Sequence, residues 1–204
     1  MGLSFHYNAI IRDSKHVQEL TTEVKDICLS LGWEFQIWPL ENLAGDNPDY
    51  RINNYELNDL KGISFTPENC ETVFLTFLPD NNLVSPVDFI LGKELHPYTN
   101  DRTLSTKTQF AGIDCHLAIM KLMLYLKEKY FSKLDITDEG QYWETKNEDI
   151  LKKQFQLYEG YLNAVSDAFS ELKSIPGESP ASLADRIEQI LNTIHQNISD
   201  NKSI

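Results

Sequence analysis

One histidine of this chain occupies a place where an ionisable side chain is unusual. Residues 113–131 carry apolar side chains at helical spacing, and His116 falls on the apolar side of that helix, beside Met120 and Met123. It also lies in the first turn, where the helix dipole disfavours a protonated imidazole. A neutral imidazole there acts as a general base or ligand anchor, or else as a core histidine bonded to a strand carbonyl. The core histidine is the interpretation we favour.

A second group of polar and aromatic side chains follows an expected strand and precedes a helix. Paired carboxylates beside aromatic rings can bind a sugar, a cation or an arginine-bearing partner. The alternative, which we favour, is a solvated turn whose tryptophan fills an apolar gap. If this turn and His116 converge on one cavity, they form a candidate pocket. Its residues would be His116, Asp138, Glu139, Tyr142 and Trp143.

The motifs that mark well-known catalytic and cofactor sites are absent from the sequence. There is no glycine-rich phosphate loop, no HExxH, no GxSxG and no EF-hand loop. Cys28, Cys70 and Cys115 are widely spaced, so neither a zinc knuckle nor a disulfide framework is expected. We interpret Cys28 and Cys115 as small core side chains. We therefore expect no metal, no cofactor and no catalytic residue, which weighs against an enzyme.

Four phrases of the sequence resemble those of an uncharacterised family of small bacterial proteins with no assigned activity. The resemblance covers roughly residues 1–158 and leaves the helical tail outside. It implies a bacterial source and a shared core fold, and it transfers no catalytic residue. The phrases are Ser4-Phe-His-Tyr7, Gly62-Ile-Ser-Phe-Thr-Pro67, Leu104 to His116, and Asp138-Glu-Gly-Gln-Tyr-Trp-Glu-Thr145.

The charge balance of the chain argues against nucleic acid as a partner. The chain has 18 Lys and Arg against 31 Asp and Glu, a net charge of −13. Such a chain repels phosphate, which argues against a general nucleic-acid binder. Acidity is compatible with solubility alone, or with docking onto a basic protein.

We expect no membrane span, because no run of 18 uncharged apolar residues exists. The N-terminus shows no signal-peptide pattern, so we expect a cytoplasmic protein.

The apolar periodicities predict an α+β fold: an antiparallel or mixed sheet with helices on one face, plus a C-terminal helical hairpin. Two polar loops are expected, one at 41–61 that can include a short turn of helix and one at 92–109. A capping box is expected from Thr145 to Glu148. Strands are expected at 3–11, 33–38, 63–65, 71–78, 83–91 and 134–137, and helices at 14–31, 113–131, 145–173 and 180–198.

The C-terminal hairpin carries more apolar surface than one helix pair needs. We expect a core domain over residues 1–145 and a hairpin extension over 146–204, packed on the core or on a second copy. Large exposed apolar patches are rare on monomers, so we favour a homodimer through the C-terminal helices. In the first helix of this hairpin, apolar side chains recur at alternating intervals of four and three residues and form a stripe along one side. It consists of Leu151, Phe155, Tyr158, Leu162, Val165, Phe169 and Leu172.

These observations favour a non-catalytic protein-interaction module, such as an immunity or antitoxin-like inhibitor. The alternative is a small-ligand binder or enzyme with its site near His116 and the turn at 138–145. Convergence of those residues on one cavity would discriminate between the two.

Overall fold

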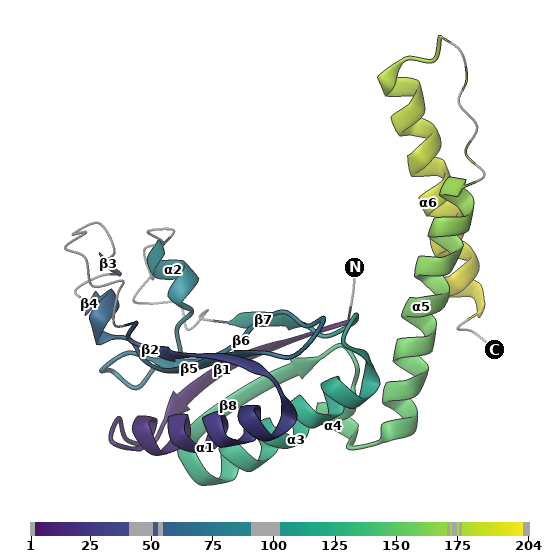
Figure 1. Cartoon of the computed structure of the whole chain (residues 1–204). Helices are drawn as coiled ribbons and strands as arrows, with labels where there is room; N and C mark the ends of the chain where they lie inside the picture. Colours follow the sequence, from purple (N-terminus) through teal and green to yellow (C-terminus); the bar gives the residue numbers. More distant parts are fainter. Residues whose placement is uncertain are drawn as a thin grey trace. The chain divides into compact units, whose positions relative to one another are not determined.

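In the computed structural model the chain has the predicted α+β fold, with antiparallel sheets followed by long helices (Figure 1). The structure describes residues 3–40, 51–52, 55–90, 103–170, 172, 175 and 177–201. It divides into two units, Met1–Leu151 and Lys152–Ile204. The expected loops at 41–61 and 92–109 lie partly outside the described residues.

The first sheet is built around the N-terminal strand. β1 (Ser4–Ile11) lies between β7 (Leu104–Lys107) and β8 (Phe131–Asp138), and both pairings are antiparallel. Every second residue of β1 is buried, which is the alternation that a strand with one covered face requires. Its buried side chains are Phe5, Tyr7, Ala9 and Ile11.

The second sheet is built from β2 (Glu34–Trp38), β5 (Lys61–Thr66) and β6 (Val73–Phe77). β5 is the central strand and pairs antiparallel with both neighbours. Gly62 of β5 has a φ of 138°, and a Cβ there would lie 2.1 Å from the carbonyl oxygen of Leu75. Only glycine therefore allows the two strands to approach this closely.

A tyrosine hydroxyl and a short backbone segment join the two sheets. Tyr7 Oη accepts a hydrogen bond from Phe74 N at 2.8 Å and donates one to Phe74 O at 3.2 Å. Leu83 N donates to Ala9 O, and Leu83 also forms a bridge with Phe77. We call these contacts the sheet junction. Burial raises the pKa of Tyr7, so its hydroxyl stays protonated and can donate.

Two helices cover the same face of the sheets (Figure 1). α1 (His16–Leu31) ends at Gly32, whose φ of 68° gives the left-handed cap that the sequence predicts. α3 (Gly112–Tyr130) buries Ile119, Met123 and Leu126, as its periodicity predicts. The residues predicted to share its polar face are exposed, and they are Asp114, Lys121, Tyr125 and Glu128.

The smaller elements correct several predictions. The return strand predicted at 83–91 is wrong: after the bridge at Leu83, Pro86 begins the short helix α2 (Pro86–Ile90), since proline suits a first helical turn. The loop predicted at 92–109 contains strand β7. Within the segment predicted as a loop at 41–61, β3 (Arg51–Ile52) pairs with β4 (Tyr55–Glu56), and a 3-10 turn covers Leu57–Asp59.

The predicted capping box at Thr145 is also wrong. Thr145 is the last residue of the short helix α4 (Tyr142–Thr145). The next helix, α5 (Glu148–Ser170), is capped by Asn147, whose Oδ1 accepts a hydrogen bond from Asp149 N at 2.8 Å. The intervening Lys146 has a φ of 55° and separates the two helices.

The second unit consists of most of α5 and of α6 (Pro180–Asn201). Leu151 is the buried residue of α5, and it belongs to the first unit. Among the side chains described from residue 152 onward, every one is at least partly exposed. No helix in the described part of the chain is long and apolar enough to cross a membrane.

Candidate functional site

His116 lies in the middle of a buried chain of hydrogen bonds. Its Nδ1 atom is 2.7 Å from Thr108 Oγ1, and its Nε2 atom is 3.2 Å from Asp138 Oδ2. Thr108 and His116 have no exposed surface, and Asp138 is 4% exposed. We call Thr108, His116 and Asp138 the His116 network. It links the end of β7, the first turns of α3 and the last residue of β8.

The carboxylate fixes the direction of one hydrogen bond in this network. An ionised carboxylate only accepts, so the Nε2–H of His116 donates to Asp138. The Nδ1 atom of His116 shares the other hydrogen bond with the hydroxyl of Thr108. The imidazole also packs against the ring of Phe5 in a T-shaped arrangement, with ring planes 89° apart and centroids 6.4 Å apart. The histidine thus has a fixed orientation.

Asp138 organises the turn that follows β8. Its Oδ1 accepts a hydrogen bond from Gly140 N at 2.7 Å, and its Oδ2 accepts from Tyr142 N at 2.9 Å and Trp143 N at 3.0 Å. The last two amides open helix α4, so Asp138 supplies a carboxylate to a helix N-terminus. The carboxylate at position 138 therefore has two roles: it accepts hydrogen bonds from the backbone of its own turn, and it contacts His116.

The electrostatics of Asp138 favour its ionised form. Burial alone would raise the pKa of this carboxyl group. The hydrogen bond from His116, the electrostatic interaction with His116, and the backbone amides of Trp143 and Gly140 outweigh burial and hold the pKa below its usual value. The group is therefore an anion at neutral pH, held within the protein by donors on three sides.

Gly140 shows how closely this region is packed. A Cβ at position 140 would lie 2.6 Å from Leu151 Cδ1, 3.0 Å from Asp138 Oδ1 and 3.1 Å from His116 Nε2. The glycine backbone thus fills the space above the imidazole–carboxylate contact. The side chains of His116 and Asp138 are 0% and 4% exposed, so the surrounding protein encloses this contact.

A hydroxyl, an imidazole and a carboxylate in series are also the groups of a hydrolase triad. A nucleophilic hydroxyl must meet its substrate, however, and Thr108 exposes no surface. Its Oγ1 also lies 3.4 Å from the carbonyl oxygen of Leu3. The geometry therefore supports the core-histidine interpretation, with a carboxylate and a hydroxyl in place of the expected strand carbonyl.

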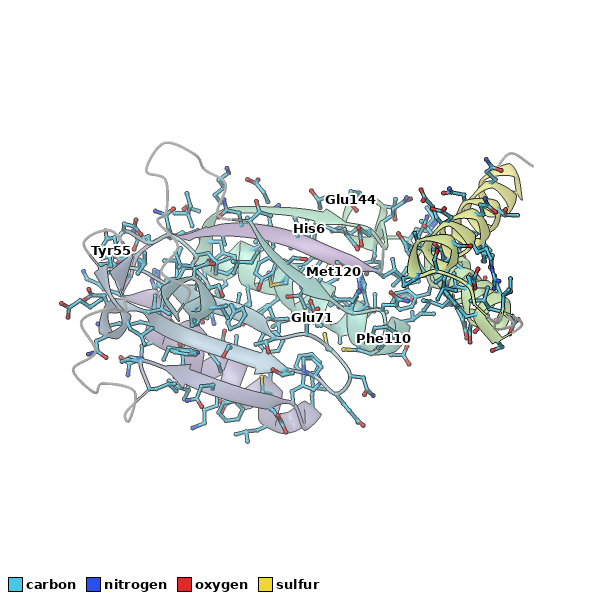
Figure 2. The ribbon with its side chains drawn as sticks, turned by 90° about the horizontal axis from the view of Figure 1, so that it is seen from above. His6, Tyr55, Glu71, Phe110, Met120 and Glu144 are labelled. Atoms are coloured by element: carbon cyan, nitrogen blue, oxygen red, sulfur yellow. The ribbon has the colours of Figure 1, made fainter. Side chains whose placement is uncertain are left out.

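The side chains of the acidic turn contact different elements of the fold. Glu139 turns to β1, where its Oε2 accepts a hydrogen bond from Ser4 N at 2.7 Å. The side chain of Tyr142 is buried. Glu144, labelled in Figure 2, accepts from Asp138 N at 3.0 Å. The predicted proximity of His116 to Asp138 is thus present, whereas Glu139 contacts a different element.

Trp143 forms a separate surface feature. Lys146 Nζ lies 4.1 Å from the centre of its ring, and Lys127 Nζ lies 5.5 Å from it. Lys146 Nζ also donates to Trp143 O at 2.6 Å. Burial, followed by the charge of Lys127, lowers the pKa of Lys146. The ring is half-buried and two lysine side chains lie over it; the expectation that this tryptophan fills an apolar gap stays a prediction.

Sequence reasoning missed two members of this region, Thr108 and Gly140. Thr108 falls in a segment predicted as a loop, and no periodicity connects it to the helix that follows. The pattern Asp-Glu-Gly at 138–140 was a detectable signal, since an Asp two residues before a Gly often accepts the glycine amide in a turn.

No protein-family model, no curated protein and no solved structure matches this chain. Its function is therefore argued from its own geometry, and the resemblance to an uncharacterised bacterial family stays a prediction.

Proposed function

We propose that the chain is a non-catalytic protein-interaction module that associates with a second copy of itself through α5 and α6. One observation carries this proposal. From residue 152 onward, none of the side chains that the structure describes is buried, although both helices carry regular apolar stripes. Leu162 and Phe169 of α5 are 39% and 40% exposed, and Leu183 of α6 is 38% exposed.

The physical argument is one of unburied apolar surface. A helix in water gains most of its stability from packing its apolar face, rather than from intrinsic propensity. α5 has 23 residues and α6 has 22, which corresponds to about 35 Å of helix for each. Two antiparallel helices cover one side of each other only. Two such hairpins together form a four-helix bundle, in which both stripes face a common core.

The distribution of charge favours a second copy over a highly charged partner at this surface. Residues 152–204 contain five basic and seven acidic side chains, a net charge of −2. The preceding residues carry the other −11. Like-charged copies therefore repel weakly at the helices, and apolar contact can hold them together.

The acidic first unit is then the part suited to a basic protein partner. An immunity or antitoxin-like inhibitor is the specific role that this combination supports, with the helices setting its oligomeric state. The alternative, an enzyme or ligand binder at His116, is less supported because the His116 network is enclosed by the protein.

Analytical ultracentrifugation of the full-length protein tests self-association. We expect a dimer at tens of micromolar, and a monomer for the double variant Leu162→Glu/Phe169→Glu. The matched control is Asn163→Glu/Ser170→Glu, which adds the same charges at neighbouring exposed positions of the same helix and should remain dimeric.

A monomeric full-length protein at these concentrations would refute self-association. A double variant that still forms a dimer would move the interface away from the apolar stripe. A truncated protein that ends at Gln156 lacks most of α5 and all of α6, so it should be monomeric. If that form still dimerises, the contact lies in the first unit.

A further inference from the structure

Two lysine side chains of the first unit converge on one tryptophan ring. Lys127 belongs to α3, and Lys146 follows directly after α4. Their Nζ atoms lie 5.5 Å and 4.1 Å from the centre of the Trp143 ring. The tryptophan is half-buried, whereas both lysines are exposed and can be reached from solvent. We call these three residues the Trp143 cluster.

Hydrogen bonds hold Lys146 in place at both its backbone and its side chain. Its amide donates to Tyr142 O at 2.8 Å and closes the end of α4. Its Nζ atom donates to Trp143 O at 2.6 Å. An ammonium group has three N–H donors, so two donors of Lys146 have no acceptor among the described residues. The cluster therefore presents oriented donors at the surface.

Neither lysine of the Trp143 cluster is paired with a carboxylate. On the same helix as Lys127, the exposed Lys121 forms an ion pair with Glu148 at 3.3 Å. Within the part of the chain that the structure describes, Lys127 and Lys146 form no such pair. Two unpaired positive charges thus lie beside one ring, in a chain whose net charge is −13.

The acidic side chains of the adjacent turn already have backbone partners. Asp138 accepts hydrogen bonds from three amides, and Glu139 and Glu144 accept one amide hydrogen bond each. The two lysines, in contrast, keep N–H donors that no described residue accepts. A ligand that complements these donors and their charge is an anion.

We propose that Lys127 and Lys146 bind a phosphate group beside the ring of Trp143. Two ammonium groups match a phosphate monoester, which carries a charge of about −1.5 to −2 at neutral pH. A carboxylate carries a single negative charge and would leave one lysine uncompensated. Lysine is a common phosphate ligand and acts as a point charge. This site does not rest on self-association through α5 and α6.

The electrostatics of the cluster agree with an anionic ligand. Burial lowers the pKa of Lys146, and the positive charge of Lys127 lowers it further. The charges of Glu144 and Asp138 act in the opposite direction without cancelling this effect. A phosphate group bound to both lysines would offset their mutual repulsion and raise the pKa of Lys146.

The acidity of the whole chain selects a small ligand and does not exclude phosphate. At physiological ionic strength, salt largely screens exposed charges that are more than about 8 Å apart. A single phosphate group therefore responds mainly to the two nearest lysines. A long polyanion such as nucleic acid would extend over the acidic surface and be repelled.

The test follows the tryptophan indole groups of isotope-labelled, full-length protein by NMR while sodium phosphate is added at pH 7. Sodium chloride keeps the ionic strength constant. We expect the indole signal of Trp143 to shift along a saturating one-site curve. The signal of Trp38 should stay in place, because its indole N–H donates to Ser64 Oγ in the core. Glycerol phosphate tests a monoester in the same way, and the lower Kd identifies the source of the phosphate group.

Variants assign the binding to the two lysines. Lys127→Gln and Lys146→Gln should each weaken phosphate binding at least about tenfold, because each removes a hydrogen bond between charged groups. Lys146→Arg keeps the charge and should retain binding. The matched control is Lys121→Gln, which removes an exposed charge from the same helix and should change the Kd less than about twofold.

Chemical protection gives a measurement on the unmodified protein. N-hydroxysuccinimidyl acetate acetylates accessible lysines, and mass spectrometry of the peptides gives the rate at each position. Phosphate at a saturating concentration should slow the acetylation of Lys127 and Lys146. The rate at Lys133, an exposed lysine of β8, should stay the same.

Three results would overturn the proposal. One is a Trp143 signal that shifts linearly with phosphate and never saturates. Another is sodium acetate binding as tightly as phosphate, because a site for a divalent anion must distinguish the two. The third is an equal loss of binding in Lys121→Gln and Lys146→Gln, which would show that only the general charge of the surface matters.

Discussion

Removal of the Asp138 carboxylate should destabilise the first unit more than any nearby acidic substitution. This carboxylate accepts hydrogen bonds from three backbone amides and from His116 Nε2. Asp138→Ala leaves those donors without the charged acceptor, in a region with almost no access to water. Breaking a buried charged contact from one side costs about 3–5 kcal/mol, and a bond to a charged acceptor contributes about 1.5–3 kcal/mol. We therefore expect a loss of about 3–5 kcal/mol in the free energy of unfolding.

The assay is urea denaturation at pH 7, followed by circular dichroism. Asp135→Ala is the matched control, because Asp135 lies on the same strand but is exposed, where it pairs with the exposed Lys133. Surface pairs of this kind contribute about 0–1 kcal/mol. Equal small losses in the two variants, below about 1 kcal/mol, would refute the argument that Asp138 organises the turn.

The same carboxylate gives the prediction a pH dependence. Its pKa is lowered in the folded protein, so its contribution to stability is fully present above the unfolded value of about 4. The contribution is lost as the pH falls through the lower folded value. The difference in stability between wild type and Asp138→Ala should therefore shrink below about pH 4. A difference that instead grew on acidification would contradict the sign.

The remaining predictions concern side-chain packing. Leu126→Ala should cost about 2–5 kcal/mol in chemical denaturation, and a loss below about 1 kcal/mol would mean that this side chain is not in the core. Gly140→Ala should cost about 1–3 kcal/mol through crowding, whereas Gly160→Ala, with open space around its Cβ, should gain up to about 1 kcal/mol.

Much of the fold could be predicted because local patterns decided it. The alternation in β1, the glycine after α1 and the apolar face of α3 each carry a signal within a few neighbouring residues. The segment after β6, predicted as a strand at 83–91, carries no such decisive local pattern. Leu83 does pair with a strand, but Pro86 begins a helix three residues later, and strand and helix patterns are hard to separate over so short a segment.

The site illustrates a different limit of sequence reasoning. The unusual place of His116 was visible from its helical position, because a helix repeats every 3.6 residues. Asp138 was placed in the same candidate pocket, but its partner Thr108 was not visible, since that contact depends on how β7 pairs with β1.

The sheet junction has a consequence for the order in which the chain can fold during synthesis. β1 leaves the ribosome first, yet its neighbour β8 follows only after most of the first unit has been made; Ser4 and its partner Glu139 are 135 positions apart. Tyr7 and Phe74 are separated by 67 positions. β6 can therefore provide a first anchor for β1 about halfway through the first unit, once β5 has paired with it. The hydroxyl of Tyr7 thus lets β1 bind to β6 while the sheet that contains β1 is still incomplete.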